Sequence, residues 1–128
     1  MRSQAREAVF KYLFSRLFNP SDEGLFTVLC KELSKEDKDF ASELLCAVDN
    51  SANKYDNLIE ELAIGYKLNR IYNADRCAMI LGMAELDNFK DTPIPVVIDE
   101  TVKLVAKYST ENSTDFVNGI MAEYARRL

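Results

Sequence analysis

The segment that most constrains the fold of this chain is an apolar stretch near its middle. Residues 77–84 read Cys-Ala-Met-Ile-Leu-Gly-Met-Ala, so a helix through them is apolar on every side. Asn73 precedes the stretch and can cap a helix that begins at Ala74. A helix that is apolar all round has to be buried among other elements. The sequence therefore predicts a central helix that the rest of the chain covers.

Helices are also the elements expected around this central segment. Apolar residues recur at steps of three and four along most of the chain, which is the spacing of one helix face. Only four Gly and three Pro are present to form turns, and no useful length alternates between polar and apolar residues. The expected helices cover residues 4–18, 22–33, 34 to about 62, a stretch from 74, 95–108 and a stretch from about 113.

The third of these helices has a clear start and two possible lengths. Ser34 is a suitable N-cap, and the acidic residues that follow it favour a first helical turn. No Gly or Pro interrupts the apolar pattern before Gly65, so the simplest interpretation is one helix of about 28 residues. Residues 49–53 have weak helix propensity and could instead mark a break.

The length of the chain indicates one domain. At 128 residues, about two thirds of the unfolded surface can be buried on folding, which is enough for a hydrophobic core. Neither a tandem repeat nor a low-complexity tract divides the chain. We therefore predict a single compact all-α domain of six helices over residues 1–128.

Cysteine usage and hydropathy predict a protein of the reducing cytoplasm. Cys30, Cys46 and Cys77 are odd in number, far apart in sequence and flanked by apolar residues. We expect them to be reduced residues of the core, not a metal site. Glu7 and Lys11 interrupt the apolar residues at the start of the chain, and no apolar run approaches the length of a membrane span.

The residue types argue against an enzyme. The chain has no histidine, which is the commonest general base and metal ligand. Its serines and cysteines lie in no nucleophile, phosphate-loop or C-x-x-C motif. Adjacent acids such as Glu60-Glu61 and Asp99-Glu100 could do acid–base work or hold a cation, but such pairs usually lie on solvated helix faces. No catalytic residue, cofactor or metal is expected.

Charge is distributed unevenly along the chain. The formal net charge is −5, whereas a protein that sequesters nucleic acid by itself is normally basic. Residues 1–18 contain four cationic side chains against Glu7 alone. Among them, Arg2 and Arg6 are expected at the exposed start of the first helix, together with Gln4. Such side chains can donate to RNA phosphates and base edges, although arginines near a terminus are usually only solvated surface.

Two motifs in the last third of the chain resemble a known signature. A helix opens with Pro95-Val-Val-Ile-Asp-Glu100, and the next helix contains Phe116-Val-Asn-Gly119. Together they resemble the C-terminal signature of the NusB family of bacterial transcription antitermination factors. Weaker similarity covers residues 2–18 and 75–86, while residues 19–70 match only in apolar pattern.

This resemblance implies a fold and a set of partners. The fold would be a six-helix domain made of two packed three-helix bundles. The family pairs with the small-subunit ribosomal protein NusE, and the pair binds the boxA element in the leader of nascent ribosomal RNA. The complex allows RNA polymerase to resist termination. Some members form a homodimer that hides the RNA face, and nothing in this sequence decides that question.

The resemblance also implies which residues bind these partners. Arg2, Gln4 and Arg6 match an arginine-rich start that contacts RNA, and Phe14 matches an aromatic position that could stack on a base or lie in the core. Asn112 and Phe116 match a segment near the RNA, although Phe116 could simply be packed. For NusE, the matching residues are Asp75, which could also serve only the helix dipole, and Arg76.

Several positions depart from the family pattern. Ile80 and Asp115 stand where relatives often have a basic residue, Ala84 replaces the usual Tyr, and the N-terminal arginines are sparse. Each lost cation is expected to weaken RNA affinity and to flatten its dependence on salt.

These departures leave two other functions open. One is a protein-interaction adaptor that contacts NusE but has little RNA binding of its own. Another is an enzyme accessory domain, because the same fold precedes a methyltransferase domain in some ribosomal RNA cytosine methyltransferases. The chain ends at Leu128 without a catalytic domain, so this third function is not expected.

Overall fold

The computed structural model describes residues 2–20, 22 and 24–128, and every regular element within these residues is helical. The helices follow the amphipathic patterns of the sequence, with boundaries shifted by a few residues. They are α1 (Arg2–Arg16), α2 (Leu25–Leu29), α3 (Lys35–Asp49), α4 (Lys54–Leu62), the 3-10 turn η1 (Leu68–Arg70), α5 (Asn73–Asn88), α6 (Ile94–Tyr108) and α7 (Glu111–Arg126).

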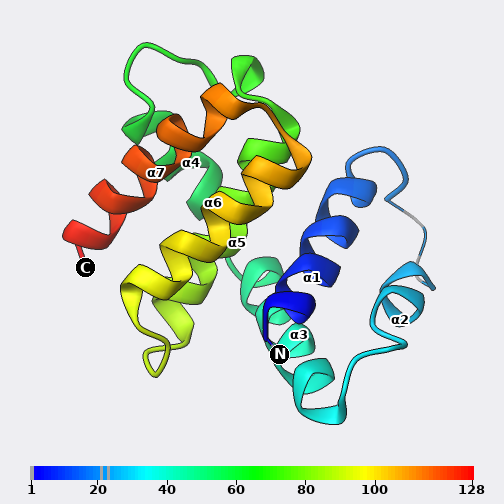
Figure 1. Cartoon of the computed structure of the whole chain (residues 1–128). Helices are drawn as coiled ribbons and strands as arrows, with labels where there is room; N and C mark the ends of the chain where they lie inside the picture. Colours follow the sequence, from blue (N-terminus) through cyan, green and yellow to red (C-terminus); the bar gives the residue numbers. More distant parts are fainter. Residues whose placement is uncertain (1, 21, 23) are drawn as a thin grey trace.

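Helix α5 lies at the centre of the molecule, as its apolar sequence predicts. It contacts α1 and α3 on one side and α4, α6 and α7 on the other (Figure 1). Met79, Leu81 and Met83 of α5 are at most 2% exposed. Because α5 belongs to the core of both groups of helices, the described residues form one continuous hydrophobic core.

The expected six-helix count is wrong for the described residues, because the predicted long helix is two helices. α3 begins where expected, with the Ser34 hydroxyl accepting a hydrogen bond from the Asp37 amide at 3.1 Å. It ends at Asp49, and α4 starts at Lys54. Between them Ala52 adopts a φ of 50°, a left-handed conformation that no helix interior tolerates. The weak propensity of residues 49–53 thus decides against a single helix. The two-bundle description stays a prediction, because α5 contacts both groups of helices.

The three cysteines do not share one environment. Cys30 and Cys77 are buried, as expected, but Cys46 is exposed on α3, so its assignment to the core is wrong. Burial raises the pKa of the Cys77 thiol to about 11, so this side chain stays protonated and packs as an apolar residue. All three thiols are free. Within the described residues, no helix is long and apolar enough to cross a membrane.

A carboxylate at the end of α5 ties three helices together. Asp87 accepts hydrogen bonds from the hydroxyls of Tyr55 on α4 and Tyr124 on α7, each at 2.6 Å, and from the ammonium of Lys54 at 3.0 Å. Burial alone would raise the pKa of Asp87, but these three donors outweigh it and hold the pKa below its ordinary value. The ionised carboxylate is therefore the form that the fold stabilises.

This arrangement predicts a loss of stability in acid. Since the pKa of Asp87 is lower in the folded chain than in the unfolded chain, its contribution is complete above the ordinary pKa of about 4 and disappears as the pH falls through the folded value. We expect the free energy of unfolding, measured by urea titration between about pH 2 and 7, to fall less steeply for Asp87→Asn than for the wild type. Asp115→Asn, which changes an exposed acid, serves as the control. Equal slopes for wild type and Asp87→Asn would contradict this assignment.

Candidate nucleic-acid interface

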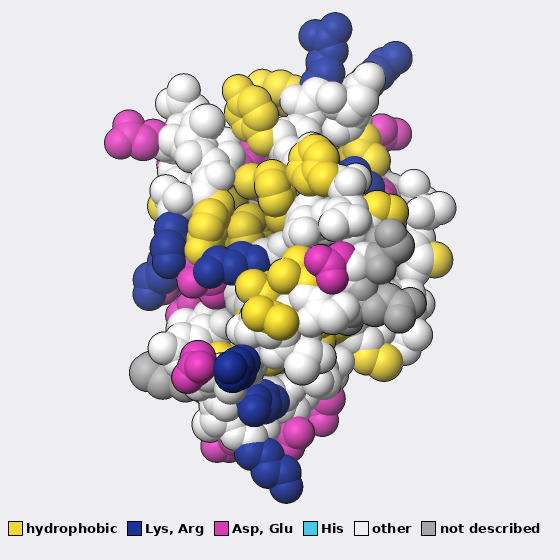
Figure 2. Space-filling model, turned by 90° about the vertical axis from the view of Figure 1, so that its right-hand side faces the viewer, with side chains coloured by type: hydrophobic (Ala, Val, Ile, Leu, Met, Phe, Trp, Pro, Cys, Tyr) yellow, Lys and Arg dark blue, Asp and Glu magenta, His cyan; other side chains and the backbone are white. Residues whose placement is uncertain are grey.

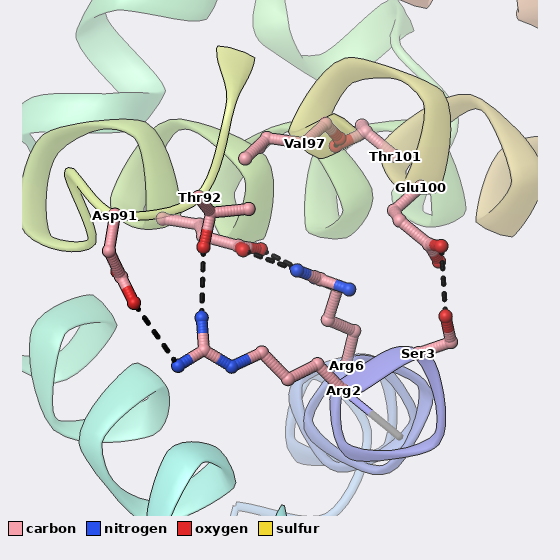
Figure 3. Close-up of polar contacts among 9 residues, drawn as sticks. Arg2, Ser3, Arg6, Asp91, Thr92, Val97, Glu100 and Thr101 are labelled. Carbon is pink, nitrogen blue, oxygen red and sulfur yellow. Dashed lines mark hydrogen bonds and ion pairs between the residues drawn. The ribbon is translucent and has the colours of Figure 1, made fainter. Parts of the chain in front are cut away.

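The N-terminal end of α1 is fastened to the turn between α5 and α6. The Arg2 guanidinium donates to the Thr92 hydroxyl at 2.9 Å and lies 3.5 Å from the Asp91 carboxylate (Figure 3). It also sits 4.5 Å above the centre of the Phe40 ring. Its side chain is 42% exposed, so Arg2 keeps the surface position that its predicted role requires.

Arg6 does not lie at the exposed end of α1, and that expectation is wrong. The residue is 5% exposed, and its guanidinium donates two hydrogen bonds, of 2.7 and 2.6 Å, to the carboxylate of Glu85 on α5. In such a bidentate pair, two N–H groups of the planar guanidinium donate to the two oxygens of the carboxylate. Arg6 follows the same helical face as Ala5 and Val9, which are completely buried. In this structure Arg6 joins α1 to α5 and offers no donor to the surface.

Gln4 and Phe14 lie on the outer face of α1. Gln4 is exposed and lines a shallow hollow of about 200 Å³ together with Glu7 and Lys11. Phe14 is 36% exposed, and its ring centroid lies 6.3 Å from that of Phe10 on α1 and 5.4 Å from that of Phe18, just beyond the end of the helix. Of the two alternatives for Phe14, the structure favours a surface position that is partly supported by its neighbours.

The start of α7 places a second pair of predicted residues. The Thr110 hydroxyl caps the helix by accepting a hydrogen bond from the Ser113 amide at 3.2 Å. This cap leaves Asn112 exposed in the first turn. One turn later, Phe116 is partly buried, and its ring meets Tyr66 edge to face at a centroid distance of 5.4 Å.

Asn112 and Phe116 line a pocket that also contains Asp75. The Asp75 pocket, as we name it, has a volume of about 340 Å³ and lies between the start of α5, the start of α7 and the segment that precedes α5. Arg2, Gln4, Arg6 and Phe14 do not line it, so the predicted site residues fall into separate groups on α1 and at this pocket. Its lining residues are Tyr66, Arg70, Ile71, Tyr72, Asp75, Thr110, Asn112, Ser113 and Phe116.

The two residues predicted to contact a protein partner are less exposed than expected. Asp75 is 2% exposed, and its Oδ1 atom has no hydrogen-bond partner among the described residues. Arg76 forms a bidentate pair with the Asp56 carboxylate on α4, with both hydrogen bonds at 2.7 Å. These hydrogen bonds raise the pKa of Arg76 further above its ordinary value. Asp75 therefore faces a pocket, while Arg76 and Asp56 form a partly exposed ion pair beside it.

Sequence reasoning missed Glu85 and the segment that precedes α5. Glu85 is the buried partner of Arg6, and the available signal was an acid that directly follows the apolar stretch 77–84. Tyr66, Arg70 and Tyr72 line the Asp75 pocket, but they come from a stretch without helical periodicity. An aromatic and basic composition in an irregular segment was the only clue to them.

Apolar side chains gather on the face of the molecule that Figure 2 shows. They cover much of the middle of this face, with Lys and Arg side chains at its top, at its left-hand edge and near its bottom. An exposed apolar patch with a charged border is typical of a binding surface. The large apolar residues that are exposed anywhere on the described chain are Phe14, Leu17, Phe18, Val28, Ile64, Tyr66, Tyr72, Ile94, Val96 and Leu128.

The fold and these surface sites define a small all-helical binding protein whose candidate contact residues lie on its surface. Cations, amides and aromatic rings supply its candidate contacts, and the described residues contain no cluster of three or more potential metal ligands. The chain belongs to the NusB family, whose model matches residues 3–126. This membership confirms the resemblance carried by residues 95–119 and the expectation of a non-enzymatic protein.

Comparisons with individual proteins agree with the family assignment. Transcription antitermination protein NusB of Agathobacter rectalis is 34% identical over 129 residues, which cover 97% of this chain and 98% of that protein. A solved structure of T. maritima NusB has a TM-score of 0.92 and 32% identity, covering 98% of this chain and 91% of that one. A chain in the crystal structure of antitermination factors NusB and NusE in complex with dsRNA has a TM-score of 0.87 and 27% identity, with coverage of 99% and 97%.

Proposed function

We propose that this protein is a transcription antitermination factor that pairs with ribosomal protein NusE and binds boxA RNA in the leader of nascent ribosomal RNA, so that RNA polymerase resists termination. The observation that carries the proposal is the full-length similarity to a NusB chain from a complex with NusE and double-stranded RNA. The curated relatives support the antitermination role, because they are named transcription antitermination proteins and their similarity extends over nearly the whole chain.

The surface residues of α1 and α7 supply the RNA contacts of this proposal. Arg2 and Gln4 offer donors at the start of α1, and Phe14 offers a ring at its exposed edge. Asn112 presents an amide that can both donate to and accept from a base edge. Phe116 is partly buried and lines the Asp75 pocket. Arg6 acts indirectly, because its pair with Glu85 fixes the helix that carries Arg2 and Gln4.

Two cations near η1 add to the electrostatic part of this interface. Arg70 lines the Asp75 pocket, and Lys67 lines an adjoining hollow that shares Ile71 with it. Both side chains are exposed, and neither forms an ion pair within the residues that the structure describes. Cations without a carboxylate partner are the ones most available to RNA phosphates. They compensate in part for the sparse arginines of α1.

NusE is the proposed protein partner. This chain carries a formal net charge of −5, which suits a basic partner that shares the work of holding RNA. Arg76 with Asp56 stays the proposed contact on the surface beside α5. Asp75 is open only to a group that enters its pocket.

RNA binding is measured by fluorescence anisotropy of a labelled boxA-like RNA, with this protein alone, with NusE alone and with both. We expect NusE and this protein together to bind more tightly than either alone. Replacing the two cations near η1, in Lys67→Ala/Arg70→Ala, is expected to weaken binding about 10-fold at low salt and to reduce the slope of log K against log salt by about 1–2.

A charge-matched control separates phosphate contacts from a general loss of positive charge. Lys103→Ala/Arg126→Ala removes two exposed cations that are already paired with Asp99 and Glu123. This variant is expected to bind as the wild type does. If wild-type protein adds nothing to the RNA affinity of NusE alone but still binds NusE, the function is that of a NusE adaptor with little RNA binding.

A further inference from the structure

Four aromatic rings form a continuous row from the end of α6 along α1. The ring centroid of Tyr108 lies 5.1 Å from that of Phe10, and the Phe10 centroid lies 6.3 Å from that of Phe14. The row ends at Phe18, whose centroid lies 5.4 Å from that of Phe14. The Phe18 amide donates to the Ser15 carbonyl at 3.0 Å, so the chain is still in a turn at this point. We name these four rings the aromatic row.

Exposure increases along the aromatic row. Phe10 is 2% exposed, Phe14 is 36% exposed and Phe18 is 67% exposed. The buried ring anchors the row in the core, while the last ring faces solvent. A single exposed apolar side chain is normal on a protein surface. Phe18, however, continues a packed row, and its neighbour Leu17 is 42% exposed as well.

The aromatic row touches both groups of surface residues that are proposed to contact RNA. Phe14 belongs to the group on α1. At the other end of the row, Tyr108 closes α6, only four residues before Asn112 in the first turn of α7. Phe18 is not a member of either group, but it lies next to Phe14 and extends the same surface by one ring.

The exposed end of the aromatic row has the size of a small ligand. The exposed fractions of Phe14 and Phe18 add up to about one whole phenylalanine, on the order of 200 Å². A stable interface with a second protein chain buries about 800 Å² on each partner. A nucleic acid base, in contrast, needs only one ring face on which to stack. The area of the patch therefore favours unpaired bases as its occupants.

We propose that the aromatic row binds unpaired RNA by stacking, and that Phe18 holds one base more than Phe14 alone can hold. The planes of the two rings are inclined by 56°, so one flat base cannot stack on both, and each ring takes its own base. Stacking of this kind tolerates any base. Phe18 therefore lengthens the bound RNA by one nucleotide without adding a base preference. This inference rests on the proposed RNA-binding function.

The first test uses tryptophan fluorescence, because the chain contains no tryptophan of its own. Phe18→Trp places a single indole at the end of the aromatic row, and a base that stacks on it quenches its emission. Adding a boxA-like RNA to the complex of this variant with NusE is expected to quench this emission. Val28→Trp is the matched control, because Val28 on α2 is 66% exposed and does not belong to the row. The wild-type complex supplies the blank for any tryptophan in NusE.

The second test combines a truncated side chain with a shortened RNA. Phe18→Ala is expected to weaken binding of the full-length RNA to the complex about 10-fold, since stacking on one ring contributes roughly 1–3 kcal/mol per base. On an RNA that lacks the nucleotide at Phe18, the same substitution is expected to have no effect. Phe18→Tyr keeps a ring and is expected to bind as the wild type does. Circular dichroism checks that each variant is folded.

Four results would overturn the inference. If RNA binds but quenches no emission from folded Phe18→Trp, Phe18 lies outside the RNA path. A spectral shift on adding NusE without RNA would assign the exposed rings to NusE. The same shift on raising the protein concentration alone would assign them to a second copy of this chain. An equal loss for both RNA lengths in Phe18→Ala would exclude a stacked base. The proposed function fails separately, if wild-type protein adds nothing to the RNA affinity of NusE alone.

Discussion

Replacing Arg6 with alanine is expected to lower the free energy of unfolding by about 3–5 kcal/mol, the largest effect of any single substitution considered for this protein. Arg6 and Glu85 are 5% and 1% exposed, and their hydrogen bonds of 2.6 and 2.7 Å join α1 to the central helix α5. Loss of the guanidinium leaves the Glu85 carboxylate buried without its partner, which costs far more than loss of a surface ion pair. Urea denaturation followed by circular dichroism measures the effect.

Two controls separate this pair from ordinary ion pairs and from packing. Arg16→Ala breaks a pair with Asp49 in which the two side chains are 31% and 46% exposed, so we expect a loss of at most about 1 kcal/mol. The double substitution Arg6→Met/Glu85→Leu removes both charges and fills the site with apolar atoms, and it should recover most of the stability that Arg6→Ala loses. If Arg6→Ala costs no more than Arg16→Ala, the buried pair is not a major contributor.

Replacing Gly82 with alanine is expected to destabilise the fold by about 1–3 kcal/mol. A Cβ atom at this position of α5 would clash with the Thr101 hydroxyl of α6 and would lie 2.6 Å from the terminal methyl of Met121 on α7. Met121 is flexible and can move, but Thr101 is β-branched, and its hydroxyl donates to the Val97 carbonyl at 2.9 Å. Relief of the clash thus requires α5 and α6 to move apart.

Gly119→Ala is the matched control, and its expected effect has the opposite sign. Gly119 also lies inside a helix, α7, but a Cβ atom there would meet nothing within 4 Å. Alanine should therefore stabilise the helix by about 0.5–1 kcal/mol through its better helix propensity. Thermal denaturation of both variants measures the difference. Similar effects at the two positions would show that close packing at Gly82 is not important.

Those parts of the architecture that depend on a long hydrophobic pattern or on neighbouring residues were predictable from the sequence. The all-apolar run at 77–84 indicated a central helix, and α5 is buried in this position. The Ser34 cap was also predicted, because an N-cap depends only on neighbouring residues. The break between α3 and α4 was only an alternative, because a turn of four residues changes an otherwise continuous apolar stripe very little.

The candidate site was less predictable, because its residues meet only after folding. Arg6 is four residues from Arg2 in sequence and has the same chemistry, yet one is buried and the other is 42% exposed. What separates them is Glu85, which lies 79 residues away along the chain. The Asp75 pocket likewise combines three segments that no local pattern connects. Sequence periodicity indicates which face of a helix is apolar, but not which charged residue of another helix will pack against that face.

The attachment of α1 to α5 also has a consequence for the order in which the protein is made. The partners of Arg2 and Arg6 lie at residues 85–92, so they leave the ribosome long after α1 has been synthesised. Until then the two arginines lack these partners, and the apolar face of α1 has only α2 and α3 to cover it. A nascent chain stopped before Glu85 should therefore hold α1 in a protease-sensitive state. The first helix to emerge is among the last to be fixed in place.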